Sequence, residues 1–146
     1  MAVGVLALQG AVREHLETLQ RIGVEAVTVR TPQEVEASEA LILPGGESTT
    51  IGKLVVRYGL QEPIRQFAAA GRPLLGTCAG MILMAQRIEG GIEDQPRLGV
   101  MDITVARNAF GRQVDSFEAD LEFAGVKGGP ARAVFIRAPI IQSVGP

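Results

Sequence analysis

The only cysteine of the chain, Cys78, stands in the segment Gly76-Thr77-Cys78-Ala79-Gly80. The apolar run before it is typical of a short buried strand, and residues 81–87 after it have the pattern of a helix. A nucleophile on a sharp turn between strand and helix, with glycine two residues to either side, forms a nucleophile elbow. The free N–H groups and positive dipole end of the helix stabilise a thiolate there. We therefore predict that Cys78 is the nucleophile of an acyl-transfer enzyme.

A structural role is the alternative interpretation of Cys78. Free cysteine is among the residue types most often buried as a small hydrophobe. Glycine is also common in this chain, with 18 of 146 residues, so flanking glycines could arise by chance. The predicted strand before the motif and the predicted helix after it are the context that an elbow requires. They favour the catalytic interpretation.

A second glycine-rich turn, Gly45-Gly46-Glu47-Ser48-Thr49-Thr50, also follows a predicted strand and opens a predicted helix. Its plainest interpretation is a glycine turn with Ser48 or Thr49 as the helix N-cap. The same backbone N–H groups could hold an oxyanion or a substrate carboxylate, and Glu47 could receive a substrate ammonium group. The segment is not a phosphate-binding Walker loop, because that motif's second glycine-lysine pair is missing.

Two arginines are candidates for binding a carboxylate. Arg107 begins a turn rich in hydrogen-bond donors, residues 107–113, and Arg137 lies at the end of a predicted strand. Arginine can grip a carboxylate through two parallel hydrogen bonds. The competing interpretation of each is a solvated surface residue.

His15 is the only histidine, and so the only imidazole that could take the proton of the Cys78 thiol. It lies near the start of the first predicted helix, where a surface position or a contact with a partner is the better interpretation. A cysteine hydrolase needs a base, and no histidine follows Cys78 in these 146 residues. We therefore expect the 146 residues by themselves to be catalytically impaired.

Composition excludes several classes of function. Hydrophobic residues make up 47% and charged residues 21% of the chain, which is ordinary for a globular domain. The formal charge of −2 provides no basic surface for a nucleic-acid partner, and no apolar stretch is long enough for a membrane span. A lone cysteine cannot form an internal disulfide, and the start of the chain lacks a secretory leader. These features predict a cytoplasmic protein.

Strands and helices alternate through the first half of the chain. Apolar runs predict strands over residues 3–8, 25–29, 40–43 and 73–77. Helical spacing predicts helices over residues 12–22, from Pro32, from Ser48 or Thr49 to Tyr58, over 63–70 and over 81–87. This alternation indicates an α/β fold with an open, mostly parallel sheet and helices on both faces. Gln9-Gly10, Gly45-Gly46 and Cys78 all follow carboxyl ends of strands, where such sheets carry their reactive groups.

The pattern changes after Gln86. Residues 89–97 form a polar segment with Gly90-Gly91, and strands are predicted over residues 100–106, 117–123 and 133–137. We expect these strands to be antiparallel additions to the edge of the sheet. Residues 1–146 are interpreted as one domain, without a linker, that is incomplete at its carboxyl end.

Taken together, five segments resemble the PdxT/SNO family of class I, triad-type glutamine amidotransferases. They are residues 8–15 (LQGAVREH), 43–50 (LPGGESTT), 76–80 (GTCAG), 107–118 (RNAFGRQVDSFE) and 135–139 (FIRAP). The cysteine motif is common to all such amidotransferases, whereas the segments at Gly45 and Arg107 are particular to this family. The resemblance covers the whole chain and implies a three-layer, flavodoxin-like fold.

The resemblance also implies roles for individual residues. Cys78 would attack the side-chain amide of L-glutamine, Gly46 and Ala79 would form the oxyanion hole, and glutamine would be bound by Gly46, Glu47, Ser48, Arg107, Ile136 and Arg137. The ammonia released would pass to a (β/α)₈-barrel synthase subunit that builds pyridoxal 5′-phosphate. That subunit would meet Gln9, Gly10 and His15, and no cofactor or metal is implied. The family completes its triad with a His-x-Glu pair that these 146 residues do not contain.

Two other hypotheses stay open at this point. The chain could be a non-catalytic docking or regulatory module of the same complex, which keeps the fold but lacks the triad histidine and glutamate. It could also be a cysteine α/β-hydrolase acting on esters, which the elbow alone would support. The presence or absence of a His-x-Glu segment distinguishes a glutaminase from a docking module. Dependence of the activity on glutamine distinguishes a glutaminase from an ester hydrolase.

Overall fold

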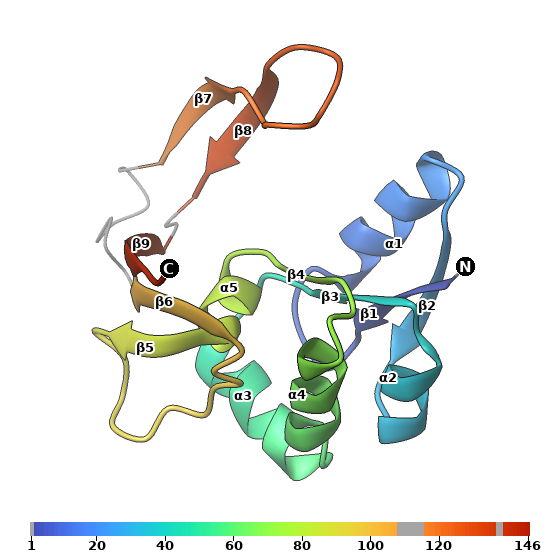
Figure 1. Ribbon diagram of the computed structural model, residues 1–146, viewed down its shortest axis with the longest axis vertical. Coiled ribbons are helices and arrows are strands. Elements are labelled where there is room, and N and C mark those ends of the chain that lie inside the picture. The colour runs from blue at the N-terminus through green and yellow to red at the C-terminus, as the bar shows by residue number, and fades with distance from the viewer. Residues whose placement is uncertain (1, 108–115, 137–138) are drawn as a thin grey trace.

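A four-stranded parallel sheet lies at the centre of the computed structural model, which describes residues 2–107, 116–136 and 139–146 (Figure 1). The strands lie in the order β2-β1-β3-β4, and each neighbouring pair is parallel, as predicted. Their bounds are Ala2–Leu6 for β1, Glu25–Val29 for β2, Ala40–Leu43 for β3 and Leu74–Gly76 for β4.

Helices cover both faces of this sheet, which confirms the predicted three-layer α/β architecture (Figure 1). α1 packs Val12, Leu16 and Leu19 against Val5 and Ile42 on one face. The remaining helices contribute to a larger core on the opposite face. The helices span Val12–Arg21 (α1), Pro32–Ala37 (α2), Ser48–Arg57 (α3), Gln61–Ala69 (α4) and Ala79–Met84 (α5).

The start of α2 follows the local signal in the sequence. The Thr31 hydroxyl accepts a hydrogen bond from the Glu34 N–H at 3.3 Å, and the Glu34 carboxylate accepts one from the Thr31 N–H at 2.9 Å. This reciprocal capping box satisfies two N–H groups that the first turn of a helix leaves free. Pro32 occupies the first helical position, where its missing N–H costs nothing.

The predicted helix over residues 81–87 is wrong beyond Met84. The chain passes directly from α5 into β5, Ala85–Glu89, which pairs in parallel with β6, Met101–Ala106. Pairing with a strand that lies later in the sequence therefore overrides the local helical pattern. This junction is held by a small separate core made of Ile82, Ala85, Ile103 and Val105.

Antiparallel pairs form in the later part of the chain, as predicted, although β6 also pairs in parallel with β5. The expected attachment of these strands to the edge of the main sheet is wrong. β9, Ile140–Val144, is a strand without a predicted counterpart, and it pairs with β6 to complete a second sheet of three strands. β7, Phe117–Leu121, and β8, Ala131–Phe135, form a hairpin that projects from the body (Figure 1). In each pair the backbone groups that face the partner strand are hydrogen-bonded without the edge of the main sheet.

Among the helices of the described residues, none has both the length and the apolar character required to span a bilayer.

Candidate active site

Cys78 lies at a strained turn between β4 and α5. Its backbone has φ of 49° and ψ of −105°, and α5 begins at the next residue. Few non-glycine residues adopt positive φ, which costs on the order of 1–3 kcal/mol and is concentrated at functional sites. The Cys78 side chain is exposed. The structure therefore confirms the predicted elbow, and the interpretation of Cys78 as a buried hydrophobe is wrong.

The two glycines of the motif allow β3, β4 and α5 to meet closely. A Cβ atom on Gly80 would lie 2.8 Å from the carbonyl carbon of Leu43, and one on Gly76 would lie 2.6 Å from the carbonyl carbon of Gly80. Real Cβ atoms do not approach other atoms so closely. The glycines are therefore required by packing around the elbow, whereas the residue with positive φ is the cysteine itself.

The carboxyl ends of β1, β3 and β4 come together, as the parallel arrangement predicts. The N–H of Ala11 donates to the carbonyl oxygen of Gly45 at 2.9 Å, and the N–H of Thr77 donates to the carbonyl of Leu43 at 3.1 Å. A Cβ atom on Gly45 would lie 3.4 Å from the Cβ of Cys78. The glycine turn after β3 therefore lies directly against Cys78.

Gln9 and Gly10 also contact this turn. The side-chain oxygen of Gln9 accepts a hydrogen bond from the N–H of Glu47 at 3.0 Å. Gly10 has φ of 100°, and a Cβ atom there would lie 2.9 Å from the carbonyl carbon of Gly45. Both residues, predicted to meet a partner, thus contact the loop that faces Cys78.

Glu47 caps α3, so the predicted cap at Ser48 or Thr49 is wrong. The Glu47 carboxylate accepts hydrogen bonds from the N–H groups of Thr49 and Thr50, at 3.1 and 2.7 Å, and from the Thr50 hydroxyl at 2.7 Å. It also forms an ion pair with Arg107 at 2.6 Å. Both carboxylate oxygens therefore have partners within the protein before any substrate ammonium group arrives.

These contacts keep Glu47 ionised. Burial by itself would raise the pKa of Glu47, but the Thr50 hydroxyl, the N–H groups of Thr50 and Thr49 and the charge of Arg107 outweigh it and lower the pKa from 4.5 to about 2. Because the folded pKa lies below the ordinary value, the ionised group contributes stability in full above about pH 4.5. That contribution is lost as the pH falls toward 2.

We expect Glu47→Gln to lower the free energy of unfolding at pH 7 by about 1 kcal/mol, because the side chain is half exposed and loses a cap and an ion pair. The variant should also lose that part of the pH dependence that lies between pH 4.5 and 2. Urea denaturation across this range measures both effects. Glu62→Gln is the matched control, since Glu62 lies exposed in the first turn of α4 and should cost less than about 0.5 kcal/mol. Equal losses of unfolding free energy in the two variants would contradict the assignment of Glu47 as the cap of α3 and the ion-pair partner of Arg107.

Arg107 is brought to the site by the second sheet. It follows β6, and its N–H donates to the carbonyl of Glu89 at the end of β5 at 2.8 Å. Its guanidinium donates to the Thr49 hydroxyl at 2.7 Å as well as to Glu47. The strand β5, which replaces part of the predicted helix, is thus one of the elements that place this arginine.

Gln95 is a site residue that the sequence did not reveal. Its side chain is 3% exposed, donates to the Ser48 hydroxyl oxygen at 3.0 Å and accepts from Arg107 at 3.0 Å. The only signal in the sequence is a glutamine within a polar segment, which is common on protein surfaces. Its burial depends on contacts with residues far away in the chain.

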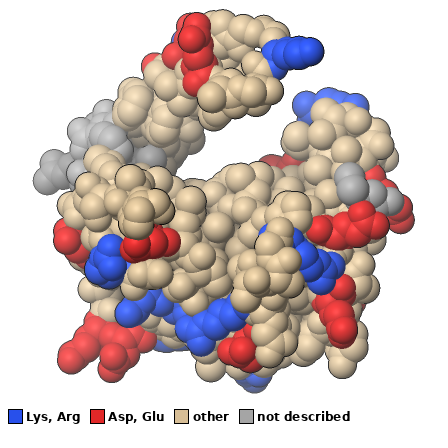
Figure 2. Space-filling view, viewed as in Figure 1, with Lys and Arg blue, Asp and Glu red and all other residues tan. Residues whose placement is uncertain are grey.

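A cavity of about 490 Å³ joins Cys78 to most of the residues predicted to bind a substrate. Arg137, predicted with them, lies outside the described residues. Figure 2 shows an open hollow between the projecting hairpin and the end of the body that carries α1. The cavity is lined by Gly46, Glu47, Ser48, Cys78, Ile82, Arg107, Ile136 and Pro139.

A larger hollow of about 860 Å³ lies elsewhere, between α4 and residues 94–100. It has arginines, such as Arg65 and Arg97, but its lining contains no nucleophile. The smaller cavity is therefore the candidate active site, because chemistry and not volume identifies it.

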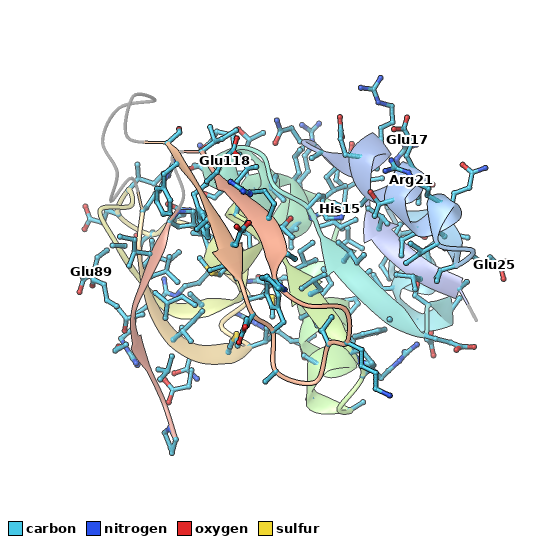
Figure 3. All side chains as sticks on the ribbon, turned by 90° about the horizontal axis from the view of Figure 1, so that it is seen from above. His15, Glu17, Arg21, Glu25, Glu89 and Glu118 are labelled. Carbon is cyan, nitrogen blue, oxygen red and sulfur yellow. The ribbon has the colours of Figure 1, made fainter. Side chains whose placement is uncertain are left out.

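His15 lies beside the elbow, and among the described residues its side chain pairs with Thr77 rather than with the cysteine. Its Nε2 atom is 3.1 Å from the Thr77 hydroxyl oxygen. Burial lowers the pKa of His15, and the charge of Glu14 opposes this only in part. Figure 3 shows His15 on the side of α1 nearest the rest of the molecule, with Glu17 and Arg21 on the outer side.

Comparison with known proteins defines the family. Residues 5–146 match the model of the SNO glutamine amidotransferase family. The chain belongs to this family. A crystal structure described as a glutamine amidotransferase superposes with a TM-score of 0.89 at 54% identity, covering 98% of this chain and 75% of that one.

Two relatives carry the name pyridoxal 5′-phosphate synthase subunit PdxT. The protein from Carboxydothermus hydrogenoformans is 58% identical over 146 residues, which cover 100% of this chain and 75% of the relative. The protein from Herpetosiphon aurantiacus is 61% identical over 146 residues, which cover 99% of this chain and 77% of the relative. A structure of PurLQS from Thermotoga maritima, 18% identical with a TM-score of 0.61, covers 97% of this chain and 65% of that one and shares the fold. The family resemblance drawn from the sequence is confirmed.

Proposed function

We propose that this glutamine amidotransferase hydrolyses L-glutamine to glutamate and ammonia through a thioester on Cys78, and delivers the ammonia to a pyridoxal 5′-phosphate synthase subunit. The observation that carries the proposal is the exposed, strained Cys78 in one cavity with Gly46, Ser48 and Arg107. Membership of the family supplies the reaction class.

The reaction begins with attack of the Cys78 sulfur on the side-chain amide carbon of glutamine. The C–N bond breaks after the thiol proton reaches the amide nitrogen, and ammonia leaves. Water then cleaves the thioester, which releases glutamate and restores the thiol. The proton relay is assigned to the histidine of the family's His-x-Glu pair.

Backbone N–H groups of Ala79 and Gly46 are proposed to stabilise the oxyanion. Ala79 is the first residue of α5, so its N–H has no carbonyl partner within that helix. Gly46 lines the cavity that contains Cys78. Ala79 follows Cys78 at the start of α5, and Gly46 lies in the glycine turn after β3 that contacts Cys78, so N–H groups from two separate elements are available on the same cavity.

The remaining lining residues are proposed to hold glutamine. Arg107 would bind the α-carboxylate, while Glu47, Ser48 and Ile136 would shape the rest of the site. Arg137, which is not among the described residues, is proposed to join them on the family resemblance alone. Because the Glu47 carboxylate already has partners in the protein, its main part is to orient Arg107 and the start of α3.

The partner is proposed to be the (β/α)₈-barrel subunit that consumes the ammonia, since relatives are named as subunits of pyridoxal 5′-phosphate synthase. Gln9, Gly10 and His15 are proposed to lie at that interface. Gln9 contacts the backbone of Glu47, and His15 contacts Thr77 beside the nucleophile. A partner that docks at the first helix would therefore contact residues that are themselves bonded to neighbours of the proposed reacting groups. We also propose that the residues form a single domain that acts in the cytoplasm without a cofactor or metal.

The test uses the complete gene product mixed with its synthase subunit. Glutamine should yield ammonia and glutamate, and 6-diazo-5-oxo-L-norleucine, an electrophilic glutamine analogue, should label Cys78 in a peptide map. Absence of labelling together with absence of ammonia release would overturn the glutaminase and leave a docking module. Ester hydrolysis without dependence on glutamine would favour the α/β-hydrolase.

A further inference from the structure

Gln95 forms a buried link between two sides of the cavity. Its amide nitrogen donates to Ser48, at the start of α3, and its amide oxygen accepts from Arg107, after β6. Both Gln95 and Ser48 are 3% exposed. A buried amide with both ends paired holds its neighbours in one arrangement, because breaking either bond leaves a polar group without a partner.

The hydrogen bonds of Arg107 leave a defined part of its guanidinium available. Nη1 donates to Thr49 at 2.7 Å and to Gln95 at 3.0 Å, and Nη2 donates to Glu47 at 2.6 Å. Arginine has five N–H donors. The Nε–H and the second Nη2–H have no acceptor among the described residues. Nε and Nη2 share one edge of the guanidinium, which is the geometry that grips a carboxylate with two parallel bonds.

Gln95 can hold Arg107 because its own segment is well anchored. The N–H of Leu98 donates to the carbonyl of Leu83 at 2.7 Å, and the N–H of Val100 donates to the carbonyl of Met84 at 2.9 Å. Pro96 packs so closely on α3 that a Cβ atom on Gly52 would lie 2.7 Å from the Pro96 carbonyl oxygen. The segment that carries Gln95 is thus tied to both α5 and α3.

We propose that Gln95 is a positioning residue for substrate recognition: together with Thr49 and Glu47 it occupies three donors of Arg107, so that the remaining pair faces the α-carboxylate of glutamine. This inference rests on the proposed function. It assigns to Gln95 a selective effect on substrates that carry that carboxylate, without any contact between Gln95 and the reacting atoms.

The test compares Gln95→Met with Gln61→Met in the complete protein bound to its synthase subunit. Methionine is similar in size but makes neither hydrogen bond of Gln95. The KM for glutamine should rise about tenfold, with kcat changed less than about threefold. Gln61 is the matched control, because its amide donates to the Arg97 carbonyl of the same segment without contacting Arg107. The KM of the Gln61→Met variant for glutamine should stay within about twofold of the wild-type value.

Two reagents for Cys78 separate recognition from general damage. The rate of labelling by 6-diazo-5-oxo-L-norleucine, which carries the α-carboxylate, should fall about tenfold in Gln95→Met. The rate with iodoacetamide, which lacks a carboxylate, should stay within about twofold. Gln95→Glu retains an acceptor for Arg107 and should keep KM within about threefold, which supplies a second variant if Gln95→Met does not fold.

Three results would overturn the inference: an unchanged KM in Gln95→Met, an equal loss of rate with both reagents, or an equal rise of KM in Gln61→Met. In each case an active wild-type complex would leave the proposed function standing. A wild-type complex that neither hydrolyses glutamine nor reacts with the analogue would instead refute both.

Discussion

Replacement of Cys78 by alanine or serine in the complete protein, assayed with its synthase subunit, should lower glutamine-dependent ammonia release by at least about 10⁴-fold. Alanine removes the sulfur, and serine offers a hydroxyl that is a far weaker nucleophile. Alanine and serine both fit at position 78, because the Cys78 side chain is exposed and lines a cavity. The measurement is the rate of glutamate formation in the presence of the partner.

The fold should survive both substitutions. The positive φ of residue 78 is set by the packing of β4 and α5 around it, and neither alanine nor serine adds an atom that would disturb that packing. We expect the free energy of unfolding to change by less than about 0.5 kcal/mol and binding to the synthase subunit to be retained. Glutamine hydrolysis that persists in Cys78→Ala would show that another group is the nucleophile.

Gly80→Ala should destabilise the protein by about 2–4 kcal/mol, which is the second large effect that we expect. In an open helix the same change would stabilise by about 0.5–1 kcal/mol, because alanine is the better helix former. Here the added methyl group would lie 3.0 Å from the Cβ of Leu43 and closer still to the carbonyl of that residue. Since backbone is the obstacle, α5 must move away from β3. The sign of the change therefore distinguishes close packing from helix propensity.

Urea denaturation of Gly80→Ala and of Gly71→Ala tests this expectation. Gly71 has φ of 72°, and no heavy atom lies within 4 Å of the place that a Cβ would take. Alanine there should therefore cost only the strain of positive φ, about 1–2 kcal/mol. Displacement of α5 should also slow the reaction of Cys78 with the glutamine analogue in Gly80→Ala and leave it unchanged in Gly71→Ala. A stabilised Gly80→Ala variant would contradict the close contact between α5 and β3.

The local signals in the sequence were sufficient for the central sheet and for the elbow that carries Cys78. Strands buried on both faces require continuous apolar runs, and the chain has them where β1 and β3 occur. β4 has an apolar run as well, although it lies at the edge of the sheet and leaves Leu75 exposed. The elbow at Cys78 is encoded within five consecutive residues, and the rule that parallel strands end at one edge places the glycine turn at residues 45–46 beside it. Each of these features depends on neighbours in the sequence or on a general rule of topology.

Local signals failed where pairing with distant residues decided the structure. Residues 81–87 have a helical pattern, yet Ala85 pairs with Met101 and the chain becomes a strand there. Ser48 is a common type of N-cap, yet its hydroxyl is buried against Gln95, and Glu47 caps the helix instead. A tertiary contact outweighs a propensity difference of a fraction of a kcal/mol.

The sequence by itself determined the elbow at Cys78, the layered architecture and the family, because these are encoded in contiguous motifs. Only the tertiary structure decided how the cavity is built around Cys78. Gln95 meets a partner 47 residues away, and His15 meets Thr77 across 62 residues. Such contacts leave no periodic trace in the chain, because they arise when separate elements pack against one another and bring their polar groups within hydrogen-bonding distance.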